Sequence, residues 1–135
     1  MTQVNLRAYQ DFVEAITSED SNDPEAFVRR IRALAAAGVN ASLLNTAAIG
    51  LPSESGEFSD LVKKVLFHGK DLSDEVRNKL CKELGDVFWY WINACRALNF
   101  DPNQVIRGNV EKLQDRHPNG TFNVNFEDTR TAADS

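Results

Sequence analysis

Residues 51–90 read LPSESGEFSDLVKKVLFHGKDLSDEVRNKLCKELGDVFWY, and this stretch decides the fold. Apolar residues recur every three or four positions on both sides of the polar turn at residues 68–71, which is the spacing of amphipathic helices. We therefore predict one helix over about residues 42–67 and a second over about residues 74–99, capped by Ser73. Because the turn between them is short, the two helices should run antiparallel.

Two pairs of acidic residues lie at helical spacing within this stretch. Glu54 and Glu57 are three residues apart, as are Glu83 and Asp86, so each pair shares one helix face. The pairs are also mirrored, because the midpoint of 57 and 83 and the midpoint of 54 and 86 both fall on Lys70 in the turn. Residues equidistant from the turn of an antiparallel hairpin lie opposite one another. We therefore expect four carboxylates at one level between the two helices.

Four carboxylates at one level need a counter-charge. Ionised carboxylates a few ångström apart repel, and without compensation they take up protons or destabilise the fold. Mg²⁺ prefers oxygen ligands and is commonly bound by carboxylates together with substrate phosphates. We predict a Mg²⁺ site here, with Mn²⁺ as a substitute. Such a site stabilises developing phosphate charge and turns a bound water into a nucleophile.

The alternative is a solvated helix face, which is the usual setting of a single E-x-x-E. The mirrored double pair argues against that reading, and so do the apolar residues that place the acids beside apolar surface, namely Leu51, Phe58, Leu84 and Phe88. Gly56, between the two glutamates of the first pair, would let the opposing helix or a phosphate approach closely. Lys63 and Lys64 are expected on solvent beside Asp60, with phosphate contact as the alternative.

The rest of the chain is also predicted to be helical. A first helix is expected near residues 6–16, a polar loop over 18–23, a second helix over 24–38 that begins at a proline, and a last helix over 102–116. Beyond it, an Asn-Gly turn and a brief alternation at Phe122, Val124 and Phe126 are strand-like. The predicted fold is an all-α antiparallel helical bundle with a single domain over residues 1–122. Residues 123–135 form an extended or mobile C-terminal tail in this prediction.

The apolar faces predict where these helices pack. The first short helix should carry Leu6, Tyr9, Phe12, Val13 and Ile16 on one face, and the second should turn Phe27, Val28, Ile31, Leu34 and Ala35 inward. The helix over 74–99 has a stripe wide enough to be buried on more than one side, as in a bundle core or a subunit interface. Pro52 predicts a kink or break near residues 50–51. Residues 89–91, Trp-Tyr-Trp, point in different directions, and at least one should pack in a core or interface.

Composition narrows the classes of function. The chain has 135 residues, enough for one domain, and 15 basic against 20 acidic residues give a formal charge of −5. This charge argues against non-specific nucleic-acid binding, which needs a basic face. No stretch approaches the roughly 20 apolar residues that span a bilayer, and the N-terminus lacks a signal pattern, so no membrane is expected. Cys81 and Cys95 should lie about 21 Å apart on one helix, unbridged and buried. A cytoplasmic location follows, in the host cytoplasm if the protein is viral.

Three segments resemble, in order and spacing, the MazG-like all-α nucleotide pyrophosphohydrolases. They read AAIGLPSESGEFSDLVKK, KELGDVFWYW and NVEKLQDRHPNGTF. The signature of that family is E-x-x-E followed, after a variable gap, by E-x-x-D, and here residues 58–82 form the gap. The resemblance covers residues 43–122. The absence of any E-x-x-H weighs against the di-iron carboxylate bundles, which also place acids between helices.

The resemblance implies hydrolysis of a nucleoside triphosphate to the monophosphate and diphosphate by a homodimer or homotetramer. It implies that Glu54, Glu57, Glu83 and Asp86 hold the metals, and that Glu54 or Glu57 orients or deprotonates the attacking water. Three residues of the last helix would reach the phosphates or the sugar: Asn109, Lys112 and Arg116. For Lys112 and Arg116 the alternative is an ordinary basic face near a helix C-terminus.

The base is not specified by this spacing. Compact virus-encoded members that resemble this chain act on dGTP, so a guanine nucleotide, dGTP or GTP, is the leading expectation. Hydrolysis of dUTP or dCTP on the same fold is the enzymatic alternative. The non-enzymatic alternative is a helical interaction module with a structural metal site.

Overall fold

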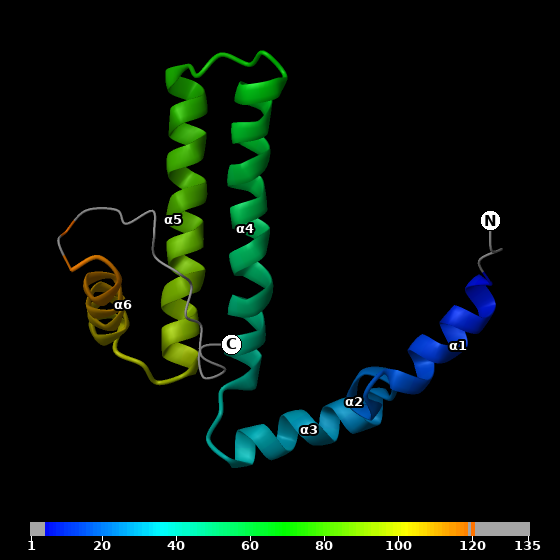
Figure 1. Ribbon diagram of the computed structural model, residues 1–135. Helices are drawn as coiled ribbons and strands as arrows, with labels where there is room; N and C mark the ends of the chain where they lie inside the picture. Colours follow the sequence, from blue (N-terminus) through cyan, green and yellow to red (C-terminus); the bar gives the residue numbers. More distant parts are fainter. Residues whose placement is uncertain (1–4, 119, 121–135) are drawn as a thin grey trace. The chain divides into compact units, whose positions relative to one another are not determined.

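The computed structural model describes residues 5–118 and 120, and this part of the chain is all-α, as predicted. The chain divides into two compact units, residues 1–98 and 99–135. The first unit contains five helices, α1 (Leu6–Ile16), α2 (Glu19–Asn22), α3 (Pro24–Ala36), α4 (Ala41–Phe67) and α5 (Asp74–Ala97), and the second contains α6 (Pro102–Arg116) (Figure 1). The predicted C-terminal tail, 123–135, and the strand-like alternation at 122–126 lie outside the described residues.

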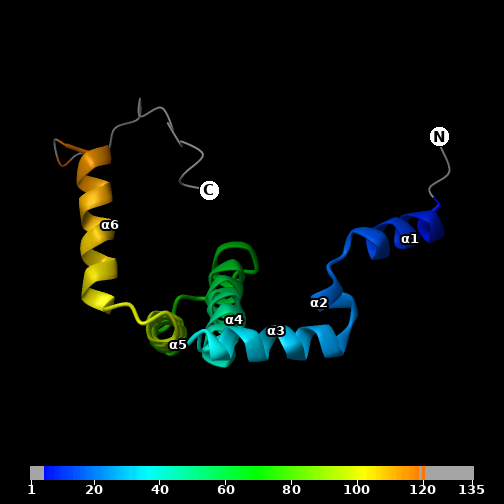
Figure 2. The same cartoon turned by 90° about the horizontal axis from the view of Figure 1, so that it is seen from below.

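The antiparallel hairpin of α4 and α5 positions the acidic residues. The two long helices lie side by side in both views (Figures 1 and 2). Their ends follow from capping: the Asn40 side chain accepts a hydrogen bond from the Leu43 amide, and the Ser73 side chain accepts one from the Val76 amide. Between the helices, Gly69 has a φ of 67°, a left-handed conformation that glycine adopts at little cost. The helix limits predicted for this hairpin are therefore confirmed to within about two residues.

Of the kink or break predicted near residues 50–51, the break is wrong. The helix α4 runs unbroken for 27 residues with Pro52 inside it. An internal proline removes one backbone hydrogen bond and costs about 3 kcal/mol, but the remaining turns and the packing along α5 offset that cost.

The register of the hairpin is fixed by a close contact between Gly50 of α4 and Tyr90 of α5. A Cβ atom placed on Gly50 would lie 2.1 Å from Cε1 of Tyr90, so only glycine fits under this ring. Residues 50 and 90 are equidistant from Lys70, as the two acidic pairs are, and the observed register is therefore the one that the mirror placement predicted. At Gly56 a Cβ would meet nothing within 4 Å, so the expectation that Gly56 admits the opposing helix is wrong.

Among the described residues, the buried ones are few and mostly small: Ala26, Ala47, Gly50, Val76, Asn93, Cys95 and Ala97. The inward face predicted for α3 is wrong for Phe27, Val28 and Ala35, which are exposed, while Ile31 and Leu34 are half-buried. The physical reason is that α3 packs on the single turn of α2 and meets α4 at a bend of 112°. The five apolar residues predicted to share one face of α1 are exposed as well.

The wide apolar stripe of α5 is covered on one side in the single chain. Val76 and Cys95 are buried, whereas Leu84 and Phe88 are 55% and 59% exposed. The consecutive aromatic residues do point in different directions: Tyr90 lies against Gly50 of α4, and Trp91 stacks on Phe88 with ring centroids 5.5 Å apart. A second partner for α5 is therefore absent from this unit of the described chain.

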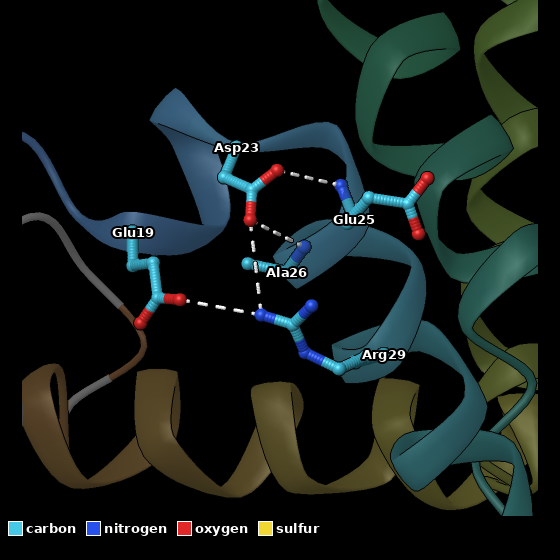
Figure 3. A network of polar contacts seen from close by, with 5 residues as sticks. All are labelled: Glu19, Asp23, Glu25, Ala26 and Arg29. Atoms are coloured by element: carbon cyan, nitrogen blue, oxygen red, sulfur yellow. Dashed lines mark hydrogen bonds and ion pairs between the residues drawn. The ribbon is translucent and has the colours of Figure 1, made fainter.

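The polar loop predicted over 18–23 contains the short helix α2, which the sequence prediction missed. Asp23 caps α3, because its carboxylate accepts hydrogen bonds from the amides of Glu25 and Ala26 at 2.9 and 3.2 Å. Arg29 reaches back to Glu19 at 3.2 Å and to Asp23 at 3.7 Å (Figure 3). These contacts fold α2 onto the first turns of α3.

Two further predictions concern cysteines and membranes. Both cysteines are free and lie on α5, but Cys95 is buried and Cys81 is exposed, so the prediction of two buried cysteines is half wrong. Over the described residues, no helix alone has the length and apolar character to cross a membrane. The bent pair of α3 and α4 meets that test on length and composition.

Candidate metal centre

Three glutamates from the two long helices converge on one point. Glu54 and Glu57 of α4 and Glu83 of α5 each offer a carboxylate oxygen, and these oxygens lie within 4.8 Å of one another. Glu54 and Glu83 are half-buried and Glu57 is exposed. The convergence follows from the sequence, because two residues three apart on α4 face a residue that lies at the mirrored position on α5.

Asp86, the fourth predicted ligand, lies near this group but outside it. Its oxygens are not among those within 4.8 Å of one another. Its charge is nevertheless felt at Glu54, whose pKa is raised above the usual 4.5 by partial desolvation and then by the negative charges of Glu57, Asp86 and Glu83. The structure thus brings three of the four carboxylates into a cluster and leaves Asp86 beside it.

The donor set fits a hard divalent cation. The nearby lysines do not neutralise the cluster, because Lys63 and Lys64 pair with Asp60 and Lys79 pairs with Glu75. Oxygen-only donors from carboxylates suit Mg²⁺ or Mn²⁺ rather than softer metals. The pKa of Glu54 is raised by desolvation and then by the neighbouring negative charges, and a bound cation would offset that repulsion.

A cavity of about 420 Å³ opens between α4 and α5 beside these glutamates. Both acidic and basic side chains line this cavity. Its lining includes Gly56, Glu57, Asp60, Lys64, Lys79 and Glu83. Such a volume is within the range of small-molecule sites.

The two lysines of the cavity lining, Lys64 and Lys79, and the neighbouring Lys63 are held by carboxylates. Hydrogen bonds from Lys63 and Lys64 lower the pKa of Asp60 to about 2, and a hydrogen bond from Lys79 lowers the pKa of Glu75. The expected pairing of Lys63 and Lys64 with Asp60 is present, but Lys64 also lines the cavity.

Lys79 was missed by the sequence reasoning, although a signal for it exists. It lies four residues before Glu83 and therefore on the same face of α5. Lys64 lies seven residues after Glu57, two turns along the same face of α4. Asn109, Lys112 and Arg116 lie on α6, spaced three and four apart, in the second unit, and their contact with a substrate stays a prediction.

The comparison with protein families shows to which family this chain belongs. Residues 44–121, more than half of the chain, match the MazG nucleotide pyrophosphohydrolase domain. The chain belongs to the MazG family. The matched range of this MazG domain includes both acidic pairs and the three candidate residues of α6. MazG membership supports nucleoside triphosphate pyrophosphohydrolase activity in general, and the family generally uses a divalent metal.

A phage protein is similar to this MazG chain. The Gene 37 protein of Mycobacterium phage L5 is 38% identical over 81 residues, which cover 58% of this chain and 70% of the phage protein. This similarity supports a phage-type member of the MazG family. No solved structure matches the chain significantly.

Proposed function

We propose that the protein is a Mg²⁺-dependent pyrophosphohydrolase that converts a nucleoside triphosphate and water into the monophosphate and diphosphate. The observation that carries the proposal is the convergence of Glu54, Glu57 and Glu83 from two helices of a MazG domain. A carboxylate cluster without a basic partner destabilises the folded protein when no cation is bound. The same cluster is suited to holding a cation beside phosphates.

Four residues would hold the metal: Glu54, Glu57, Glu83 and Asp86. When bound, Mg²⁺ supplies positive charge for the phosphates and lowers the pKa of a bound water. Glu54 or Glu57 orients the attacking water and accepts its proton. The water oxygen forms a bond to the α-phosphorus, the bond from that phosphorus to the oxygen bridging to the β-phosphorus breaks, and diphosphate leaves.

The substrate proposed is dGTP or GTP, for control of the nucleotide pool or supply of dGMP. The similarity to a phage protein supports this choice, since compact virus-encoded members that resemble this chain act on dGTP. The alternative is dUTP or dCTP. Asn109, Lys112 and Arg116 of α6 are proposed to bind the phosphates or the sugar.

The protein is proposed to act as a homodimer or homotetramer. Leu84 and Phe88 leave a large apolar area of α5 exposed on the same helix as Glu83 and Asp86. Patches of this kind on a long helix are usually covered by another subunit. Nucleic acid and membrane are not proposed as partners, in keeping with the net charge of −5.

The test is a substrate screen with each common NTP and dNTP plus Mg²⁺, with separate assays for diphosphate and orthophosphate. We expect diphosphate from a guanine nucleotide, and at least about a 100-fold lower rate for Glu57→Gln, a loss typical of removing a charge-stabilising group. Glu14→Gln on α1 is the matched control and should keep the wild-type rate. Release of orthophosphate with a nucleoside diphosphate would refute attack at the α-phosphorus. If no triphosphate is cleaved, the proposal that the protein is an enzyme fails.

A further inference from the structure

We propose that Lys64 of α4 and Lys79 of α5 form a diphosphate-binding site that holds the β- and γ-phosphates of the substrate. The site is the part of the cavity between Glu57 and Glu83 and the hairpin turn. This inference rests on the proposed function, because it assigns the direction in which a triphosphate lies in that cavity.

The direction follows from the register of the hairpin. Lys64 is seven residues from Glu57 on α4, and Lys79 is four residues from Glu83 on α5, in both cases toward the turn at residues 68–73. At 1.5 Å per residue these steps are about 10 and 6 Å along the helices. Along the helices, the cavity lining therefore passes from Glu57 and Glu83 to the ion pair of Asp60 with Lys64 and to Lys79. An α-phosphate at the glutamates would direct the β- and γ-phosphates toward the lysines.

Charge supports the same assignment. The cavity lining includes three carboxylates, Glu57, Glu83 and Asp60, and two cations, Lys64 and Lys79. A metal held by the glutamates would neutralise the phosphate beside it. The phosphates nearer the turn would still face the negative charge of Asp60. The two ammonium groups are the compensation that the cavity itself offers there.

The two lysines are oriented but not saturated. Lys64 pairs with Asp60 at 2.5 Å and Lys79 pairs with Glu75 at 2.6 Å, and their side chains remain 44% and 49% exposed. An ammonium has three N–H donors, so each lysine keeps donors for a phosphate. Half-exposed ion pairs are weak, and a phosphate with greater charge can displace or share the carboxylate. Gly56, with open space where a side chain would stand, leaves room for phosphate oxygens close to the backbone.

Lys63 provides the matched control. It also pairs with Asp60, at 2.5 Å, and is similarly exposed at 51%, but it is not part of the cavity lining. The three lysines thus share charge and exposure, while two of them face the cavity. A general effect of positive charge would appear in all three variants, and a diphosphate site would appear in two.

The experiment measures binding of inorganic pyrophosphate in the presence of Mg²⁺ by calorimetry, together with KM and kcat for the best nucleotide of the screen. We expect Lys64→Met and Lys79→Met each to weaken pyrophosphate binding about 10-fold or more, the loss of one hydrogen bond to a charged group, and to raise KM. Lys63→Met should change neither. Lys64→Arg, which keeps the charge, should recover most of the affinity. Binding of Mn²⁺ without phosphate should be unchanged in all variants.

The outcomes separate this inference from the proposed function. If the wild type cleaves triphosphates but Lys64→Met and Lys79→Met match it in pyrophosphate binding and KM, the lysine site is refuted and the enzyme stands. Equal losses in Lys63→Met would also refute it. If the wild type cleaves no triphosphate, the proposed function fails, and pyrophosphate binding that depends on Lys64 and Lys79 would still support the site.

Discussion

Glu54 illustrates how single residues in this site oppose folding. Its pKa is raised by desolvation and by three neighbouring carboxylates, so its ionised form is disfavoured in the folded protein. The contribution of protonated Glu54 to the free energy of unfolding is fully present below the usual pKa of 4.5. It is lost as the pH rises through the raised pKa. At neutral pH without metal, Glu54 is therefore a destabilising charge.

Glu54→Gln should consequently raise the midpoint of thermal unfolding in EDTA at pH 7, because the substitution removes that charge. The same variant should lose most of the increase in midpoint that Mg²⁺ or Mn²⁺ gives the wild type. Thermal scans with and without metal measure both effects, with Glu14→Gln as the control. A lower midpoint in EDTA, or an undiminished metal effect, would contradict the assignment of Glu54 to the metal site.

Asp60 should give the opposite dependence of folding stability on pH. The lysine hydrogen bonds that lower its pKa from 3.8 to about 2 stabilise the folded protein above the unfolded pKa, and this contribution is lost as the pH falls toward 2. Asp60→Asn should therefore lower the unfolding midpoint at about pH 5 and above, with a difference from wild type that shrinks below about pH 4 and disappears near pH 2. Asp11→Asn on α1, which removes an equal charge outside this ion-pair cluster, should show no such pH dependence. A difference that is constant with pH would contradict the pairing.

At the scale of helices, two glycines of α4 provide a matched pair. Gly50→Ala places a Cβ 2.1 Å from the Tyr90 ring, so we expect a loss of about 1 to 3 kcal/mol in the free energy of unfolding, as for overpacking in a core. Gly56→Ala meets nothing within 4 Å and should gain up to about 1 kcal/mol, because alanine is the better helix former. Urea unfolding of both variants measures the contrast. Equal effects at the two positions would show that Gly50 makes no close contact.

The helices that could be predicted are those with local signals at their ends. Ser73 caps α5 as the sequence indicated, and α6 has the predicted bounds, 102–116. The mirrored spacing of the acids predicted the register of the hairpin. The continuity of α4 through Pro52 was missed because packing along α5 overrides a local preference. The helix α2 was missed because four residues carry no helical period. Lys79 was missed because its place in the cavity lining depends on how α4 and α5 pack, although its spacing from Glu83 puts both residues on one face of α5.

At the scale of the whole molecule, the exposed apolar face of α5 bears on assembly. Leu84 and Phe88 are more than half exposed, and the sequence could indicate only that the stripe is too wide for one neighbour. We expect Phe88→Glu to weaken self-association at least about 30-fold, the cost of removing an interface hot spot, as measured by sedimentation over a range of concentrations. Lys82→Glu, on another face of α5, should leave association unchanged. A wild type that sediments as a monomer at every concentration would contradict the proposal.

The contact of Tyr90 with Gly50 also bears on how this kind of sequence varies. Because the register is fixed inside the helices, by a ring resting on a glycine, the turn at residues 68–73 does not have to fix it. Insertions and deletions should therefore be tolerated in that turn and not between Gly50 and Glu57 or between Glu83 and Tyr90. A length change within either of those two segments would rotate the acids off the shared face by about 100° per residue. The number of residues between the two acidic pairs is thus a poor measure of relatedness between sequences. The spacing from Gly50 to the first pair and the spacing from the second pair to Tyr90 are better measures.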